Sequence, residues 1–305
     1  MDQLWSQVGN NSTFDYVSLT QQRGLRVAFP PLAEQRAIAA VLGALDDKIE
    51  LNRRMNATLE AMARALFQSW FVDFDPVRAK REGRQPAGLD AETAALFPAA
   101  FQDSALGPAP RGWEPAIIKD CCTQIQNGGT PRRNEPRFWD KGTIPWLTSG
   151  EVRQPIVTMP ENLITEAGLA ESSAKWVAPL STVVALYGAT AGQVALVSSR
   201  LTTNQAVCAL IPKSHHAFFN YLWMRKATTE LEGKAVGSAQ QNISKGIVEE
   251  TQVILPRTPV LERFAVRVGP LFERWISNLH QFRTLAALRD ALLPKLLSGE
   301  LRVPK

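Results

Sequence analysis

One stretch of the chain, residues 126–151, concentrates residue types that bind nucleic acid. It reads QNGGTPRRNEPRFWDKGTIPWLTSGE. Cations attract phosphates and make bidentate contacts with guanine, and short polar groups read base edges. Four cations fall within ten residues, and two hydroxyl side chains follow them: Arg132, Arg133, Arg137, Lys141, Thr148 and Ser149. These six residues are predicted to contact a nucleic-acid backbone and its bases.

Two further polar regions share this character, residues 187–193 with 202–205, and residues 237–245. Amide side chains pair well with the N6 and N7 edge of adenine. The candidate contacts added by these regions are Gln193, Asn204, Gln205, Gln240, Asn242 and Lys245. For any single amide, capping of a turn is an equally good interpretation. For Trp139 and Trp146, packing is favoured over base stacking, and a basic cluster alone is typical of a solvated loop. The three regions together favour DNA contact.

Catalytic signatures are missing from the sequence. It contains neither the GxxxxGK[ST] nor the GxGxxG phosphate-binding pattern, and no Asn- or Asp-Pro-Pro-aromatic run of an amino-methyltransferase. The three cysteines, Cys121, Cys122 and Cys208, do not have metal-ligand spacing. We therefore expect no enzyme activity, no metal and no cofactor in this chain, and a stand-alone nuclease or methyltransferase is disfavoured.

Composition narrows the class of protein. The 305 residues are 45% hydrophobic and 21% charged, which suits one or two globular domains. No apolar run approaches the ~18 residues of a membrane helix, and the N-terminus does not resemble a signal peptide. The odd number of cysteines indicates reduced thiols, so a cytoplasmic protein is expected. A net charge of +5 permits nucleic-acid binding without requiring it.

The element that must position these loops is a long helix predicted over residues 30–71. Apolar or small residues recur in alternating steps of four and three, which is the pattern of a helix that pairs lengthwise with another. The predicted seam consists of Ile38, Leu42, Leu45, Ile49, Asn52, Leu59 and Leu66. A lone helix with so narrow a stripe needs a partner to cover it.

The partner is predicted within the same chain. Adding 226 to the residue number matches residues 12–67 to 238–293 with 13 of 56 pairs identical and no gap. The matching seam consists of Phe264, Val268, Leu271, Trp275, Asn278, Leu285 and Leu292. We predict an antiparallel, coiled-coil-like pair in which Asn52 and Asn278 help to set the register. Two core helices of one globular domain are the disfavoured alternative.

The predicted fold class is α+β, with one globular domain of mixed β-sheet and loops between the two long helices. Strands are expected at 116–118, 182–186, 193–197 and 206–211, and a helix at 216–232. The predicted divisions are residues 1–29, the remnant of a first recognition domain; 30–71, the first spacer helix; 72–112, a linker; 113–256, the recognition domain; 257–297, the second spacer helix; and 298–305, a tail.

Three groups of motifs carry a family resemblance. PPLAEQRAIAAVLGALDDKIELNRRMNATLEAMARALFQSWFVDFDPVRAK resembles the central conserved region of type I restriction-modification specificity (S) subunits. NGGTP, GTIPWLTSGEV, TNQA and SAQQNISK resemble one class of their target-recognition domains. TLAALRDALLPKLLSGEL resembles their C-terminal conserved region. The resemblance covers about residues 12–303.

The resemblance implies a non-catalytic subunit that reads half of a bipartite site in double-stranded DNA. It implies docking of methyltransferase (M) subunits, which use S-adenosylmethionine, and of motor-nuclease (R) subunits, which use ATP and Mg²⁺. The sequence departs from the pattern because only residues 1–29 correspond to a first recognition domain. Two outcomes stay open, an inactive remnant or a homodimer that reads a symmetric site. A protein-interaction scaffold is the alternative function.

Overall fold

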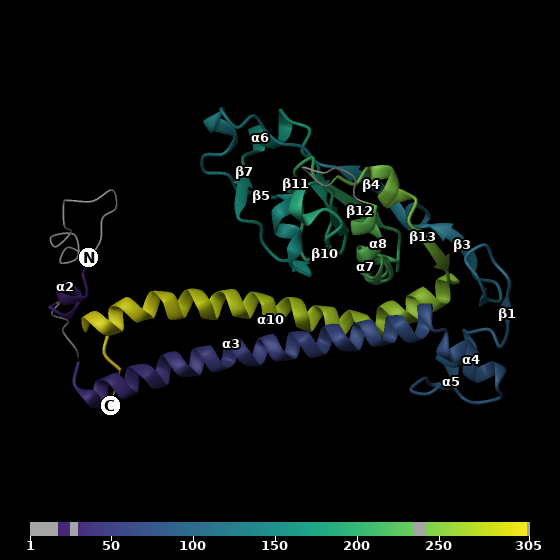
Figure 1. Cartoon of the computed structure of the whole chain (residues 1–305), viewed down its shortest axis with the longest axis horizontal. Helices are drawn as coiled ribbons and strands as arrows, with labels where there is room; N and C mark the ends of the chain where they lie inside the picture. The colour runs from purple at the N-terminus through teal and green to yellow at the C-terminus, as the bar shows by residue number, and fades with distance from the viewer. Residues whose placement is uncertain (1–17, 25–29, 235–241, 304–305) are drawn as a thin grey trace. The chain divides into compact units, whose positions relative to one another are not determined.

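A computed structural model describes residues 18–24, 30–234 and 242–303 of the chain, and Figure 1 shows its elements. Two long helices, α3 (Leu32–Phe67) and α10 (Thr258–Ser298), flank a region of mixed strands and short helices in the sequence. The described chain divides into two compact units. One contains residues up to Leu51 and from Phe282 onward, and the other contains residues 52–281.

The internal sequence repeat is also a structural repeat. The offset of 226 residues superimposes the bounds of α2 (Leu19–Arg23) on those of α9 (Lys245–Glu249). Helix α3 continues through a π-helical turn, Gln68–Val72, so that residues 32–72 match α10 end to end. The same register therefore governs both long helices and the short helix that precedes each.

The two long helices are antiparallel within the unit of residues 52–281, and an ion pair joins them in the other unit. In the unit of residues 52–281, Asn52 Nδ2 donates to Gln281 Oε1 at 3.5 Å, and Asn278 Nδ2 donates to Asn56 Oδ1 at 2.9 Å. The partners advance in opposite directions along the two helices. In the other unit, Arg289 Nη1 lies 2.9 Å from Asp46 Oδ1. The predicted fold class, an α+β chain with flanking paired helices, is confirmed.

The residues of the predicted seam are all shielded from solvent to some degree. Those classed as buried are Ile38, Ile49, Asn52, Phe264, Val268, Trp275 and Asn278. Those of intermediate exposure are Leu42, Leu45, Leu59, Leu66, Leu271, Leu285 and Leu292. Burial of one narrow stripe on each helix is what a lengthwise pair requires.

Two mixed sheets form the centre of the globular part of the chain. The five-stranded sheet has the order β4 (Cys122–Asn127), β12 (Val207–Pro212), β9 (Thr182–Ala185), β10 (Val194–Val197) and β6 (Ile156–Val157). The four-stranded sheet has the order β7 (Asn162–Ile164), β5 (Ile144–Leu147), β11 (Leu201–Thr203) and β8 (Trp176–Val177). The pairs β10–β6 and β11–β5 are parallel and the other pairs are antiparallel.

Short helices and a two-stranded ladder complete this region. Helix α7 (Ala217–Lys226) packs on β9, β10 and β12, and α6 (Glu166–Ala170) packs on the 3₁₀ turn Pro136–Phe138. Strand β13 (Gln252–Leu255) pairs with β3 (Glu114–Ile117). The four predicted strand runs overlap β3, β9, β10 and β12. The helix predicted over 216–232 is two helices, α7 and α8 (Thr228–Gly233), and the second one buries Leu231.

The segment of residues 72–112, predicted as a linker, packs into the main core. It contains α4 (Asp75–Arg81), α5 (Ala91–Ala95), β1 (Phe101–Gln102) and β2 (Ala109–Pro110). Phe74 and Phe97 are buried against Trp113, with ring centroids 5.8 and 6.2 Å from that indole. Within residues 18–24, 30–234 and 242–303, no helix is long and apolar enough to cross a bilayer.

Candidate nucleic-acid interface

The polar loops converge at one end of the five-stranded sheet. Strand β4 ends at Asn127, β9 ends at Ala185, and the antiparallel strand β12 begins between them at Val207. The backbone N–H of Leu186 donates to Ala206 O at 2.8 Å, and that of Ile243 donates to Leu186 O at 2.8 Å. Sheet pairing thus brings loops that are up to about 115 residues apart in the sequence to a shared edge.

Two glycines let the first loop lie directly against its neighbours. A Cβ built on Gly128 would come within 1.9 Å of Thr203 O, and one on Gly129 within 2.0 Å of Ser173 Oγ. The Gly129 N–H donates to Thr203 O at 2.9 Å. Only residues without a side chain fit this approach, so the glycine pair fixes where the following cationic segment begins.

Amide and hydroxyl groups cluster where these loops meet. Thr130 Oγ1 donates to Gln205 Oε1, and Asn127 Nδ2 donates to Gln205 O at 3.3 Å. The Gln205 side chain is exposed, and its amide nitrogen donates to none of the residues that the structure describes. Asn204 has a different role, because its Oδ1 accepts from the Ala206 N–H at 3.1 Å and caps the turn. Sequence reasoning included Gln205 but missed Asn127 and Thr130.

A tryptophan pair supports the first cations. Trp146 is fully buried and donates from Nε1 to Gly129 O at 2.9 Å, and its ring lies 5.1 Å from that of Trp139 in an edge-to-face arrangement. The Arg133 guanidinium lies 4.6 Å from the Trp139 ring centroid and 5.0 Å from that of Trp146. Arg132 is exposed and forms no ion pair with any described residue. Packing, rather than base stacking, is the role of Trp146.

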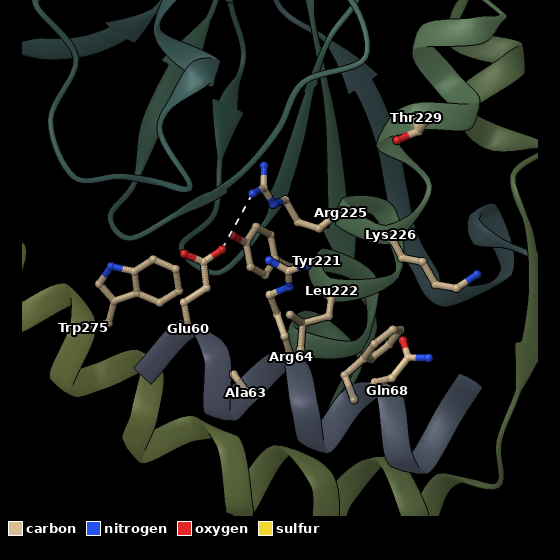
Figure 2. A pocket seen from close by; sticks show the side chains of 11 residues that line it. Glu60, Ala63, Arg64, Gln68, Tyr221, Leu222, Arg225, Lys226, Thr229 and Trp275 are labelled. Atoms are coloured by element: carbon tan, nitrogen blue, oxygen red, sulfur yellow. Dashed lines mark ion pairs between the residues drawn. The ribbon is translucent and has the colours of Figure 1, made fainter. Parts of the chain in front are cut away.

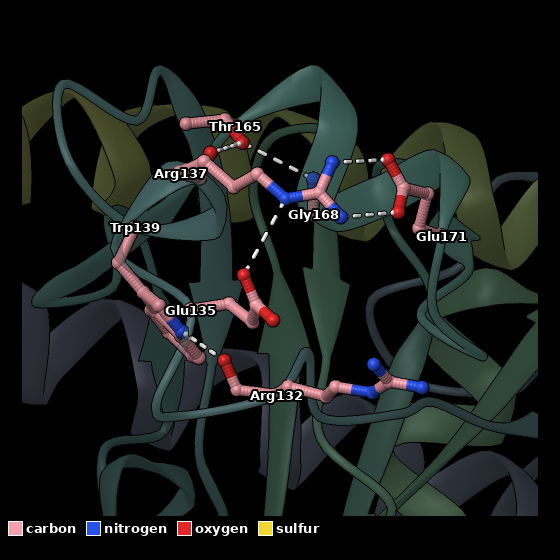
Figure 3. A network of polar contacts seen from close by, with 7 residues as sticks. All are labelled: Arg132, Glu135, Arg137, Trp139, Thr165, Gly168 and Glu171. Carbon is pink, nitrogen blue, oxygen red and sulfur yellow. Dashed lines mark hydrogen bonds and ion pairs between the residues drawn. The ribbon is translucent and has the colours of Figure 1, made fainter.

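Two of the predicted DNA-contacting cations, Arg137 and Lys141, are not among the loops at the end of the five-stranded sheet. Figure 3 shows Arg137 bound in a fork by Glu171, with nitrogen–oxygen distances of 2.8 and 2.7 Å, and paired with Glu135 at 3.5 Å. Hydrogen bonds to Glu171 raise the pKa of Arg137 and neutralise its field. Lys141 is exposed before β5 begins, whereas Thr148 follows the end of β5. The structure therefore does not bring Arg137 and Lys141 to the loops at the sheet end.

Thr148 and Ser149 directly follow β5 and lie at the edge where the polar loops meet. The Asn204 N–H donates to Leu147 O at 2.9 Å, which places the residues after β5 beside the turn before β12. Thr148 Oγ1 donates to Glu151 Oε2 at 2.8 Å, and that carboxylate also accepts the Thr148 N–H at 2.9 Å. The Thr148 hydroxyl keeps its acceptor capacity, and Ser149 begins a 3₁₀ turn half-buried.

The three other candidate amides, Gln193, Asn242 and Gln240, differ in whether their side chains are accessible for contact with bases. Gln193 lies at the same end of the sheet, but its Nε2 donates to Glu232 Oε1 of α8 at 2.6 Å, which occupies one of its amide donors. Asn242 is exposed and its backbone bridges to Tyr187. Gln240 lies outside the described residues.

A pocket lies along β4 toward Cys122, the end of that strand opposite the loop edge. It has a volume of about 420 Å³, and three lysines, Lys119, Lys213 and Lys245, line it together with two carboxylates, Asp120 and Glu249. Lys245 is 41% exposed at its side chain and lies 3.1 Å from Glu249. The Lys213 N–H donates to Cys121 O at 3.0 Å, so the β4–β12 pairing brings Lys119 and Lys213 together across 94 residues. Sequence spacing gave no signal for these two lysines.

Comparison with known proteins places the chain in a family. Residues 110–260 match the family model described as "Type I restriction modification DNA specificity domain". The HindI specificity subunit of a type I restriction enzyme from Haemophilus influenzae is 30% identical, over 95% of this chain and 72% of that protein. The MjaIX specificity subunit from Methanocaldococcus jannaschii is 26% identical, over 99% of this chain and 67% of that protein.

A solved structure agrees at the level of the fold. The S subunit of a type I restriction-modification system from M. genitalium has a TM-score of 0.60 at 14% identity, over 97% of this chain and 69% of that chain. The likeness covers the fold of almost the whole chain. The chain belongs to the family of type I restriction-modification specificity subunits, which are non-catalytic and recognise DNA target sequences. A pure protein scaffold is not favoured.

Proposed function

We propose that this chain reads one half of a bipartite DNA target through the loops at the end of its five-stranded sheet. The observation that carries the proposal is their convergence, because hydrogen bonds tie the segments around residues 127–130, 147–149, 186–187, 204–206 and 242–243 into one edge. The helices α3 and α10 fix the spacing to the other half-site and dock M subunits, which R subunits join.

The residues take different parts in this proposal. Gln205, Thr148 and Asn242 are the strongest candidates for base contact, since each offers a polar group that the fold leaves accessible. Arg132 and Lys245, which follows the segment of residues 242–243, hold phosphates. Arg133 supports the loop from its position on the tryptophans, and Arg137 is a structural ion pair. S-adenosylmethionine, ATP and Mg²⁺ belong to the partner subunits.

The test separates base readers from phosphate binders. Binding to a randomised duplex pool, with the M subunit present, is measured for wild type, Gln205→Ala, Arg132→Ala and the control Arg84→Ala. Arg84 is a cation outside the loops that pairs with Glu82. Gln205→Ala is expected to relax the choice of one base by ~1–3 kcal/mol, and Arg132→Ala to reduce the salt slope by about one without changing the sequence choice. Unchanged sequence preference and slope in both variants would contradict the proposal.

A homodimer is a second form of the same proposal. Two copies related by a two-fold axis would present two identical loop edges and read a symmetric site. Light scattering after gel filtration, with the M subunit present, distinguishes the forms. Two copies of this chain per complex support the homodimer, and a single copy removes it while leaving recognition by one copy intact.

A further inference from the structure

A second pocket lies away from the loop edge, within the unit of residues 52–281. It has a volume of about 310 Å³, and Figure 2 shows side chains from α3, α7 and α10 facing it. Its principal lining residues are Glu60, Arg64, Phe67, Tyr221, Arg225 and Trp275. None of these residues belongs to the candidate DNA-contacting loops, so the pocket is free to serve another ligand.

The charge of the pocket is unbalanced toward positive. Three cations, Arg64, Arg225 and Lys226, line the pocket with a single acidic side chain, Glu60. The Glu60–Arg225 pair is 3.7 Å long, with the two side chains 24% and 27% exposed, so it is looser than a hydrogen-bonded fork. Arg64 forms no ion pair with any residue the structure describes. The pocket can therefore accept an anion without breaking a strong internal pair.

A buried hydroxyl in the pocket also lacks a partner. Tyr221 is 1% exposed, its ring packs edge-to-face on Phe272 at 5.7 Å, and its hydroxyl makes no hydrogen bond. Burial raises the pKa of Tyr221, so the hydroxyl keeps its proton and is a donor at neutral pH. Leaving such a donor unpaired costs free energy that a bound acceptor would recover.

The walls of the pocket indicate the kind of anion. Phe67, Leu222 and Trp275 provide apolar contacts beside the cations. A carboxylate on a short hydrocarbon stem matches both parts, because its methylenes pack on the rings while its oxygens accept from arginine and tyrosine. A duplex phosphate is attached to a wide polar cylinder and brings no apolar stem. The geometry favours an acidic side chain over a DNA backbone.

We propose that this pocket receives a glutamate or aspartate side chain of the M subunit and so anchors that subunit to this chain. The inference rests on the proposed docking of M subunits and assigns it a specific contact. Arg64 and Arg225 hold the carboxylate, and Tyr221 donates the hydrogen bond that orients it.

The test measures affinity for the M subunit without DNA, by calorimetry, for the full chain and three variants. Tyr221→Phe removes one hydroxyl and keeps the ring, and it is expected to weaken binding about tenfold without lowering the Tm of the isolated chain. Arg64→Glu, at an exposed position, is expected to weaken binding at least tenfold. Lys175→Glu makes the same charge change at an exposed site far along the chain and is expected to leave the affinity unchanged.

Other results of these measurements would separate failure of the pocket assignment from failure of the proposed docking of M subunits. Wild-type affinity in both Tyr221→Phe and Arg64→Glu overturns the pocket assignment and leaves the docking proposal standing. A drop in DNA affinity of the isolated chain, with affinity for the M subunit intact, overturns it in favour of a phosphate site. Failure of the wild-type chain to bind the M subunit overturns the docking proposal and this inference together.

Discussion

Among single residues, the glycines of the first loop control the proposed interface most directly. Gly128 and Gly129 lie against β11 and residues 173–174 with no room for a Cβ. The chain then turns to Thr130, whose hydroxyl reaches Gln205, and to Arg132. A shift of the glycine pair would therefore displace hydrogen-bonding groups and a cation while leaving the charge of the protein unchanged.

Gly128→Ala is predicted to weaken DNA binding because the new methyl group would meet the backbone oxygen of Thr203. Backbone cannot yield as a flexible side chain does, so the loop must move. We expect a loss of at least tenfold in affinity in a fluorescence-anisotropy titration, with a smaller salt slope because the phosphate contact of Arg132 is displaced.

Gly150→Ala is the matched control for this substitution. It lies in the same polar stretch, but its Cβ would meet only Thr148 Oγ1 at 3.9 Å. It is expected to bind DNA like the wild type. Equal losses in the two variants would contradict the role assigned to the Gly128 contact.

At the scale of elements, an aromatic cluster joins the C-terminal end of α3 to the N-terminal half of α10. Phe264 is fully buried, with its ring centroid 4.8 Å from that of Phe71, 5.6 Å from Trp70 and 6.4 Å from Phe67. Two of these rings, Trp70 and Phe71, come from the π-helical turn that follows α3. The cluster ties both helices to the core of the same unit.

Phe264→Ala is predicted to destabilise the chain by about 3–5 kcal/mol, because it removes a large buried side chain and leaves a cavity among rigid rings. Urea denaturation followed by circular dichroism measures this change. Val266→Ala on the same helix is the control, since Val266 is 68% exposed and its truncation should cost little. A loss below 1 kcal/mol for Phe264→Ala would show that the cluster does not anchor the helices.

A polar layer interrupts the apolar seam of the helix pair. For this layer, unlike for Phe264, we predict that replacing the buried side chains raises the stability of the chain. Asn52 and Asn278 are fully buried, and the Oδ1 atom of each has no hydrogen-bond partner. Replacing both with leucine is expected to raise stability by about 1–3 kcal/mol, because a buried amide oxygen without a hydrogen-bond partner is costly. Asn56→Leu, which removes the acceptor of Asn278, is expected to lower it. A fall in Tm for the double variant would mean that this layer stabilises the pair.

The sequence predicted the helices well, because a narrow apolar stripe and a constant offset of 226 are local signals. It could not predict which strands pair. The parallel contact of β5 with β11 and the placement of Lys119 beside Lys213 depend on chain crossings without a sequence signature. For the same reason, sequence reasoning could not foresee that Glu171 would neutralise Arg137 or that Glu232 would engage Gln193.

At the scale of the whole molecule, the repeat relates two segments of equal length. Residues 32–72 and 258–298 are each 41-residue helical elements, with the last five residues of the first forming the π-helical turn. The first is followed by a packed aromatic segment, whereas the second is followed by Gly299 at a positive φ. Two helical elements of equal length are therefore followed by different segments. The segment after the first leads into the sheet domain.

The three cysteines provide a global probe of the folded state. Cys121, Cys122 and Cys208 are buried free thiols, and burial raises the pKa of each to about 12. In the unfolded chain they ionise near ~8.5. Between these values the unfolded state has lost protons that the native state retains, so the stability present below pH ~8.5 declines as the pH rises.

The free energy of unfolding is therefore expected to fall between pH 8 and 9.5 by up to about 1.4 kcal/mol per pH unit for each fully titrating thiol. Urea melts at several pH values measure this slope, and Cys208→Ala should reduce it by the contribution of one thiol. The native thiols should react with a disulfide reagent only as fast as the chain opens. Rapid reaction of all three in the folded protein at pH 8 would contradict the burial that links β4 to β12, and with it the sheet that holds the proposed DNA-reading edge.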